Sequence, residues 1–182
     1  CEERKDYNDI GISNNNIYWV EAMKDKVDIM KKKYDDIHIY NAIIDIENDK
    51  EVKFNITNNG ASSSILEFGT HATHHPHVKM INSYTGTTTR LDTLIENNNI
   101  PIENINFMNL DIQGVELRAI KSMEKYLKHI KYIYTEVNIE EVYKDCDLMK
   151  DIDEYLSNFG FMRVANNILT QYGWGDAFYM KK

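Results

Sequence analysis

The 182-residue chain is poor in cysteine and has no long apolar run. Its two cysteines, Cys1 and Cys146, give neither a disulfide framework nor a paired-cysteine metal motif, which fits a reducing compartment. No stretch of about 18 apolar residues could span a membrane, and no charged-then-apolar leader opens the chain. We therefore expect a soluble, cytoplasmic protein without a membrane partner.

Basic residues are also in the minority. Lys and Arg total 21 against 29 Asp and Glu, which gives a formal net charge of −8. A surface that coats a polyanion needs the opposite balance. We therefore expect no nucleic-acid partner.

Short β-rich runs alternate with helical patterns along the chain. This alternation predicts an α/β fold with a mostly parallel sheet that is covered on both faces. No repeat or linker stands out, so we expect one domain over residues 1–182. Residues 58–90 are expected to form a long loop, which in a compact domain usually carries function or is mobile. The expected strands cover 17–22, 37–44, 51–57, 105–111, 130–137, 161–165 and 176–180, and the expected helices cover 24–34, 91–98, 115–127 and 147–160.

Three expected strands end in a carboxylate. Glu21, Asp111 and Glu136 stand at these ends. Ligands of open α/β sheets bind beyond the carboxyl ends of the strands, so the three acids could share a site. Alternatively, each acid is simply solvated or caps the next helix. Glu21 has a specific candidate role, since an acid at the end of the second strand commonly binds the ribose hydroxyls of a nucleoside cofactor.

The stretch "FMNLDIQGVELRAI" gives the clearest site signal. Its apolar strand ends in Asp111, and Gly114 follows three residues later. A glycine there lets the backbone turn into the following helix without a side chain blocking the pocket. We predict that Asp111 faces a ligand.

The run "HATHHPH" places four histidines in seven residues. Neutral imidazoles could bind zinc or iron, but no carboxylate or cysteine spacing completes a metal signature nearby, so we assign no metal. Binding of an acceptor, proton transfer and structural packing remain open for His71, His74, His75 and His77. The serines of "NNGASSSIL" either donate hydrogen bonds to a cofactor or satisfy a turn; Ser63 is the cofactor candidate among them.

Several segments, in order along nearly the whole chain, are similar to one family. "VKFNITNNGASSSIL", "TRLDTL", "MNLDIQGVELRAIKSM", "IYTEVN" and "GWGDAFYM" resemble the FkbM family of S-adenosylmethionine-dependent methyltransferases. The resemblance implies a class I methyltransferase (Rossmann-like) three-layer fold, whose mostly parallel sheet has one antiparallel strand. It also implies S-adenosylmethionine as cofactor and O-methylation of a sugar or another small molecule.

The resemblance also assigns roles by position. Gln113 departs from the acid that the family usually carries there, which puts a second charge at that place in doubt. The family's first strand and glycine-rich turn should lie just before Cys1, so we expect further residues to precede this chain. By position, Glu21 would hold the ribose, Ala22 and Met23 would pack near the adenosine, Asn41 and Ala42 would lie at the adenine edge, and Asp111 would sit beside the methionine part and the acceptor.

Methyl transfer to a hydroxyl needs a placed nucleophile and a base that removes its proton. Asp111 is the first candidate base, Glu136 the second, and a loop histidine, His75, the third. One alternative is a nicotinamide-dependent oxidoreductase, although none of the eight glycines forms a G-x-G-x-x-G pattern. Another is a non-catalytic nucleoside-binding relative. The oligomeric state and the acceptor stay open.

Overall fold

The computed structural model describes residues 3–182, and the chain divides into two compact units, Cys1–Ile44 and Asp45–Lys182. In the first unit, β1 and β2 pair in parallel, with Trp19 opposite Ile39 and Glu21 opposite Asn41. This confirms the expected strand, helix and strand over residues 17–41, but the expected strand 37–44 breaks at Ala42. The elements of this unit are α1 (Arg4–Asp9), η1 (Asn14–Asn16), β1 (Tyr18–Glu21), α2 (Lys24–Lys33), β2 (His38–Asn41) and β3 (Ile43–Ile44).

The second unit begins with an antiparallel pair, β4 and β5. Glu51 lies opposite Thr87 and Asn55 lies opposite Ser83. The prediction that residues 58–90 form a loop is therefore wrong for their last third, where Met80–Thr89 is a regular strand. Its threonines favour an extended chain and the ladder with β4 satisfies its backbone, so polar residues do not prevent a strand here. These elements are β4 (Glu51–Thr57), α3 (His71–His74) and β5 (Met80–Thr89).

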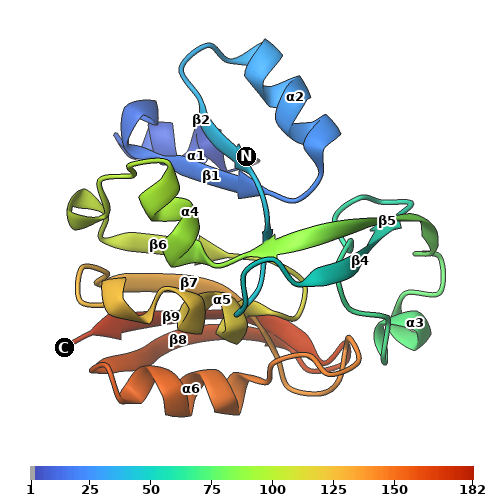
Figure 1. Ribbon diagram of the computed structural model, residues 1–182. Coiled ribbons are helices and arrows are strands. Elements are labelled where there is room, and N and C mark those ends of the chain that lie inside the picture. The colour runs from blue at the N-terminus through green and yellow to red at the C-terminus, as the bar shows by residue number, and fades with distance from the viewer. Residues whose placement is uncertain (1–2) are drawn as a thin grey trace. The chain divides into compact units, whose positions relative to one another are not determined.

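A four-stranded sheet follows, in the order β6-β7-β9-β8, as Figure 1 shows. β6 and β7 are parallel, whereas β9 is antiparallel to both of its neighbours. The prediction of one mostly parallel sheet is not confirmed, because the described strands form small sheets of mixed direction. A short turn joins β8 to β9, and such a turn can only connect antiparallel strands. The strands are β6 (Phe107–Leu110), β7 (Tyr132–Asn138), β8 (Phe161–Leu169) and β9 (Trp174–Lys181).

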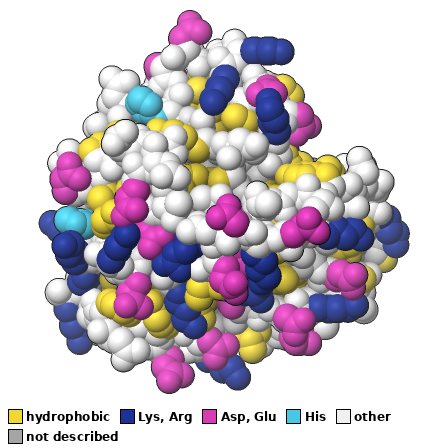
Figure 2. Space-filling model, viewed as in Figure 1, with side chains coloured by type: hydrophobic (Ala, Val, Ile, Leu, Met, Phe, Trp, Pro, Cys, Tyr) yellow, Lys and Arg dark blue, Asp and Glu magenta, His cyan; other side chains and the backbone are white. Residues whose placement is uncertain are grey.

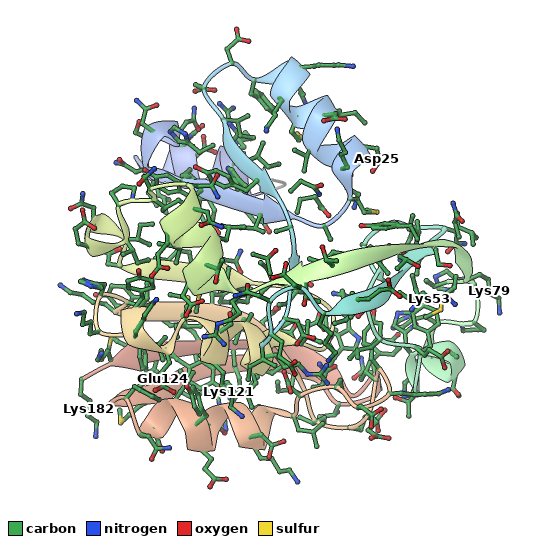
Figure 3. The ribbon with its side chains drawn as sticks, viewed as in Figure 1. Asp25, Lys53, Lys79, Lys121, Glu124 and Lys182 are labelled. Carbon is green, nitrogen blue, oxygen red and sulfur yellow. The ribbon has the colours of Figure 1, made fainter. Side chains whose placement is uncertain are left out.

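Helices α5 and α6 pack on one face of this sheet, α5 against β7 and α6 against β8. Lys121 lies over the ring of Tyr155 in α6, and the Tyr155 hydroxyl donates to Glu124, so α5, η3 and α6 are tied together (Figure 3). Basic and acidic side chains intermingle on the outer surface over these helices (Figure 2). The remaining elements are α4 (Leu91–Asn97), η2 (Ile102–Asn104), α5 (Glu116–Ser122), η3 (Glu124–Tyr126) and α6 (Met149–Ser157).

The core of the second unit lies between the sheet and these helices. Apolar side chains at helical spacing on α5 and α6 are buried, and so are alternate residues of β9, as the amphipathic patterns predict. Within residues 3–182 no helix has the length and apolar character to cross a bilayer. Fully buried side chains of this core are Ile120, Leu127, Ile130, Ile133, Val137, Ile152, Leu156 and Tyr179.

Candidate functional site

A pocket of about 290 Å³ lies in the second unit. It brings together the three predicted catalytic candidates, Asp111, Glu136 and His75, from segments far apart in the sequence. Asp111 follows the end of β6. Glu136 lies within β7, which continues two residues further to Asn138. The parallel pairing of β6 and β7 explains why the two acids meet at one end of the sheet.

The turn after β6 has an unusual backbone. Gln113 has φ +58° and Gly114 has φ +104°, both in the left-handed region. For a residue other than glycine this conformation costs about 1–2 kcal/mol. The carboxylate of Glu116 holds the turn by accepting hydrogen bonds from the backbone N–H groups of Ile112 (3.0 Å) and Gly114 (3.1 Å). Glu116 is therefore a structural part of the turn.

Gly114 is needed at this place for two reasons. Its φ favours glycine, and a Cβ atom there would lie 2.9 Å from Cβ of Cys146 and 3.1 Å from Cδ1 of Leu66. The N–H of Asp147 also donates to the Gly114 carbonyl at 2.8 Å. The glycine thus allows the turn to pack closely against the segment after β7.

The side chain of Gln113 connects the two acids. Its Nε2 donates to Asp111 Oδ1 and, at 2.9 Å, to Glu136 Oε2. Its Oε1 accepts a hydrogen bond from the hydroxyl of Tyr143, which also lines the pocket. The amide of Gln113 is thus a hydrogen-bond donor between two carboxyls.

Burial sets the protonation of two carboxyls in this cluster. Burial, followed by the neighbouring carboxyls of Glu116 and Asp111, raises the pKa of Glu136 well above its ordinary value. Burial also raises the pKa of Glu116 to about 7, although its backbone hydrogen bonds oppose the shift. Asp111 is exposed, so water can stabilise a negative charge there better than at either neighbour. The cluster therefore combines a buried Glu136, whose neutral form is favoured, with an exposed Asp111.

These raised pKa values predict how stability depends on pH. Between about pH 4.3, where a glutamate ionises in the unfolded chain, and the higher folded pKa, the folded state binds more protons, so the free energy of unfolding falls as pH rises. Glu136→Gln removes one contribution to that fall. Urea unfolding at pH 5 and pH 8 should therefore show a smaller loss of stability in Glu136→Gln than in the wild type. Equal losses in the two proteins would contradict a raised pKa of Glu136.

Two of the histidines near the pocket are held neutral. His71 is buried and stacks on Phe68, with 4.2 Å between ring centroids, and burial lowers its pKa to about 4. Burial, together with His77 and His74, also lowers the pKa of His75. A neutral imidazole can accept a proton, so His75 stays a candidate for proton transfer.

His74 has a different environment. Its Nε2 lies 2.9 Å from Glu140, which also accepts a hydrogen bond from Thr70. This contact holds α3 to the segment after β7. In the part of the chain that the structure describes, no three His, Cys, Asp or Glu side chains are arranged to hold a metal ion.

The hydroxyl of Ser63 belongs to a tight turn. It donates to the Gly60 carbonyl at 3.0 Å and accepts from the N–H of Thr57 at 3.1 Å. Its neighbour Ser62, rather than Ser63, lines the pocket. A role for Ser63 in cofactor binding stays a prediction.

The residues predicted to bind adenosine lie together in the first unit. One oxygen of the Glu21 carboxylate accepts a hydrogen bond from the N–H of Met23 at 2.8 Å, at the start of α2. Asn41 Nδ2 donates to the carbonyls of Glu21 (2.9 Å) and Ala22 (2.8 Å), and the Ala42 N–H donates to Glu21 (3.1 Å). These contacts fix the carboxyl ends of β1 and β2 side by side. The cofactor roles of these residues stay predictions.

Several residues of the pocket were not predicted as site residues, and Gln113 was noted only as a departure. Tyr143 and Trp174 both line the pocket. Trp174 stands in the segment "GWGDAFYM", which had been used only for the family resemblance. Tyr143 lies in the segment after β7, where no sequence pattern marks it.

The comparison with protein families identifies the class of protein as a methyltransferase. The chain belongs to the FkbM methyltransferase family, because the model of the methyltransferase FkbM domain matches residues 4–162. Neither a curated protein nor a solved structure matches the chain. The resemblance seen in the sequence is thereby confirmed.

Proposed function

We propose that the protein transfers a methyl group from S-adenosylmethionine to a hydroxyl of a sugar or another small molecule. One observation carries the proposal beyond the family: Gln113 links Asp111 and Glu136 in a pocket that His75 also lines. Such a cluster can bind a hydroxyl and receive its proton.

The sheet of the second unit supports a class I methyltransferase fold. Its order, β6-β7-β9-β8, contains one strand, β9, that runs against its neighbours. A single antiparallel strand is what the family resemblance implies. We propose that both units belong to one such domain.

The residues present have chemistry that fits the cofactor. S-adenosylmethionine supplies an electrophilic methyl group on a positively charged sulfur. The exposed carboxyl of Asp111 favours a nearby cation, and Glu21, at the end of β1, is an acceptor for ribose hydroxyls. The amide of Asn41 is already bonded to the backbone of Glu21 and Ala22, so it would shape the adenine edge rather than bind it directly.

Each residue of the pocket would then have a separate role toward the acceptor. Asp111 accepts the hydrogen bond of the reacting hydroxyl and takes its proton, because it is the solvated acid of the cluster. Burial raises the pKa of Glu136, so its carboxyl favours the neutral form, which donates a hydrogen bond to the acceptor. The neutral His75 is the second candidate base. The side chains of Tyr143 and Trp174 exclude water from one wall.

Isothermal titration with S-adenosylmethionine, S-adenosylhomocysteine and NAD is the direct test of cofactor class. We expect both adenosyl ligands to bind and NAD not to bind. Methyl transfer from labelled S-adenosylmethionine to a panel of sugars and small alcohols then tests the reaction. Binding of NAD alone would favour an oxidoreductase, and adenosyl binding without transfer to any acceptor would favour a non-catalytic relative.

The carboxylate of Glu21 should contribute to cofactor affinity. Glu21→Ala removes an acceptor for ribose hydroxyls, so S-adenosylmethionine should bind more weakly by about 1.5–3 kcal/mol, the range for hydrogen bonds to charged groups. Asp25→Ala, at an exposed acid of α2 in the same unit, removes the same charge and should leave affinity unchanged. Equal affinity of folded Glu21→Ala and wild type by titration would remove Glu21 from the site.

A further inference from the structure

We infer that Gln113 is a positioning residue that holds Asp111 and Glu136 as one hydrogen-bonded pair and thereby sets the pH range in which the site works. The inference rests on the proposed function for its meaning in catalysis. The pairing itself can be tested without a substrate.

The contacts of Gln113 fix the orientation of its amide. Both hydrogens of Nε2 are directed to acids, Asp111 and Glu136, and the opposite end, Oε1, accepts the hydroxyl of Tyr143. Only the NH₂ end of an amide can donate to carboxyls, and only its oxygen can accept from a phenol. The hydroxyl of Ser64 also donates to the backbone carbonyl of Gln113 at 2.8 Å. The side-chain amide is therefore held by three hydrogen bonds, and the backbone of the same residue by a fourth.

The backbone at this position supports a role for the side chain. Gln113 has φ +58°, where glycine is the residue with the least strain, and the next residue, Gly114, is also left-handed. A strained conformation that persists beside a pocket is often part of a functional arrangement. Here it places the amide between the ends of β6 and β7.

The charge around the pair explains why a neutral donor is useful. No Lys or Arg lines the pocket within the described residues. An acid at position 113 would add a further negative charge beside three carboxyls, whereas the amide adds none and donates to two of them. The other titratable groups that face the pair are Glu116 on α5, Tyr143 after β7, Asp176 opposite Glu136 on β9, and His71, His75 and His77 on and after α3.

Loss of the Gln113 amide should therefore change the pH at which Asp111 and Glu136 ionise. A hydrogen bond donated to a carboxylate stabilises its charged form, so removal of the donor raises the pH at which the acid loses its proton. If Asp111 must be ionised to act as a base, the acidic limb of the rate profile moves to higher pH. A residue that only held the turn would lower the amount of folded protein without moving that limb.

Two substitutions distinguish the effect of the Gln113 side chain from the effect of its left-handed backbone. Gln113→Gly removes the side chain and relaxes the left-handed residue, so the variant should fold, and Gln113→Glu keeps the shape but replaces the donor with an acid. The exposed Gln171, in the turn between β8 and β9, offers matched controls with the same changes, Gln171→Gly and Gln171→Glu.

The first readout is the titration of ¹³C-labelled carboxyl groups by NMR, which needs no ligand. We expect the titration midpoint of Glu136 to rise by about one pH unit in Gln113→Gly and further in Gln113→Glu, with no change in the Gln171 variants. Unchanged midpoints in folded Gln113 variants would overturn the inference.

The second readout is the pH profile of methyl transfer with an acceptor from the panel. We expect the acidic limb to shift upward with the NMR midpoints. A shift of the midpoints without any methyl transfer by the wild type would uphold the pairing and refute the proposed function. Active variants with unshifted profiles would uphold the function and refute the role of Gln113.

Discussion

Asp111→Asn should lower the turnover of methyl transfer by roughly a hundredfold or more, the size of effect expected when a general base is removed. The asparagine keeps the shape of the side chain, and its Oδ1 can still accept the hydrogen bond from Gln113 Nε2. Charge and basicity are lost, while the turn held by Glu116 remains. The affinity for S-adenosylmethionine should change much less than turnover, so single-turnover rates and titration together provide the measurement.

Glu136→Gln is the matched control for this substitution. Because burial raises the pKa of Glu136 and favours its neutral carboxyl, the amide analogue should retain much more activity than Asp111→Asn. A folded Asp111→Asn variant with near-normal turnover would reject Asp111 as the base and leave His75 as the better candidate. Loss of activity in Glu136→Gln alone would instead assign the essential carboxyl to β7.

Gly114→Ala should reduce the free energy of unfolding by about 3 kcal/mol, or prevent folding. A left-handed alanine costs about 1–2 kcal/mol, and an added methyl group in a packed interior costs about 1–3 kcal/mol. Both apply at φ +104°, where the new Cβ would lie 2.9 Å from Cβ of Cys146. Urea unfolding at fixed pH measures the loss.

Gly160→Ala separates the cost of a left-handed alanine from the cost of the added methyl group. Gly160 has φ +82°, but a Cβ there would meet only Cγ of Lys181 at 4.0 Å. This variant should lose only the backbone contribution and therefore remain more stable than Gly114→Ala. Equal losses of stability in the two variants would show that close contact with the segment after β7 is not the reason for a glycine at position 114.

Most of the regular elements follow from local sequence patterns. The helix over 24–33 and the strand over 107–110 were predicted within a few residues, because apolar spacing on a half-buried element is a strong local signal. The strand Met80–Thr89 was missed, because its polar side chains resemble a loop and only the ladder with β4 makes it a strand. The direction of β9 likewise depends on its pairing with neighbours that are distant in the sequence.

The site, too, was predicted only where it follows from local sequence patterns. Asp111 and Glu136 could be placed together, since parallel strands end at one edge of a sheet. The link between them could not be predicted, because Gln113 was visible only as a missing charge. Its value as a donor depends on the left-handed backbone and on Tyr143, thirty residues away in the sequence. Which of the four histidines line the pocket also depended on the geometry of α3 and the turn after it.

The two tryptophans of the chain are distributed one to each compact unit. Trp19 lies in β1, two residues before Glu21, with its ring 6.0 Å from that of Tyr7, and Trp174 lines the pocket that holds Asp111. Tryptophan fluorescence can therefore be assigned to one of the two units by removal of the other tryptophan. In Trp19→Phe the remaining emission reports on occupancy of the pocket, and in Trp174→Phe it reports on the region of β1. Under the proposed function, a stopped-flow experiment with the two variants would give the order in which S-adenosylmethionine and the acceptor bind, without any attached dye.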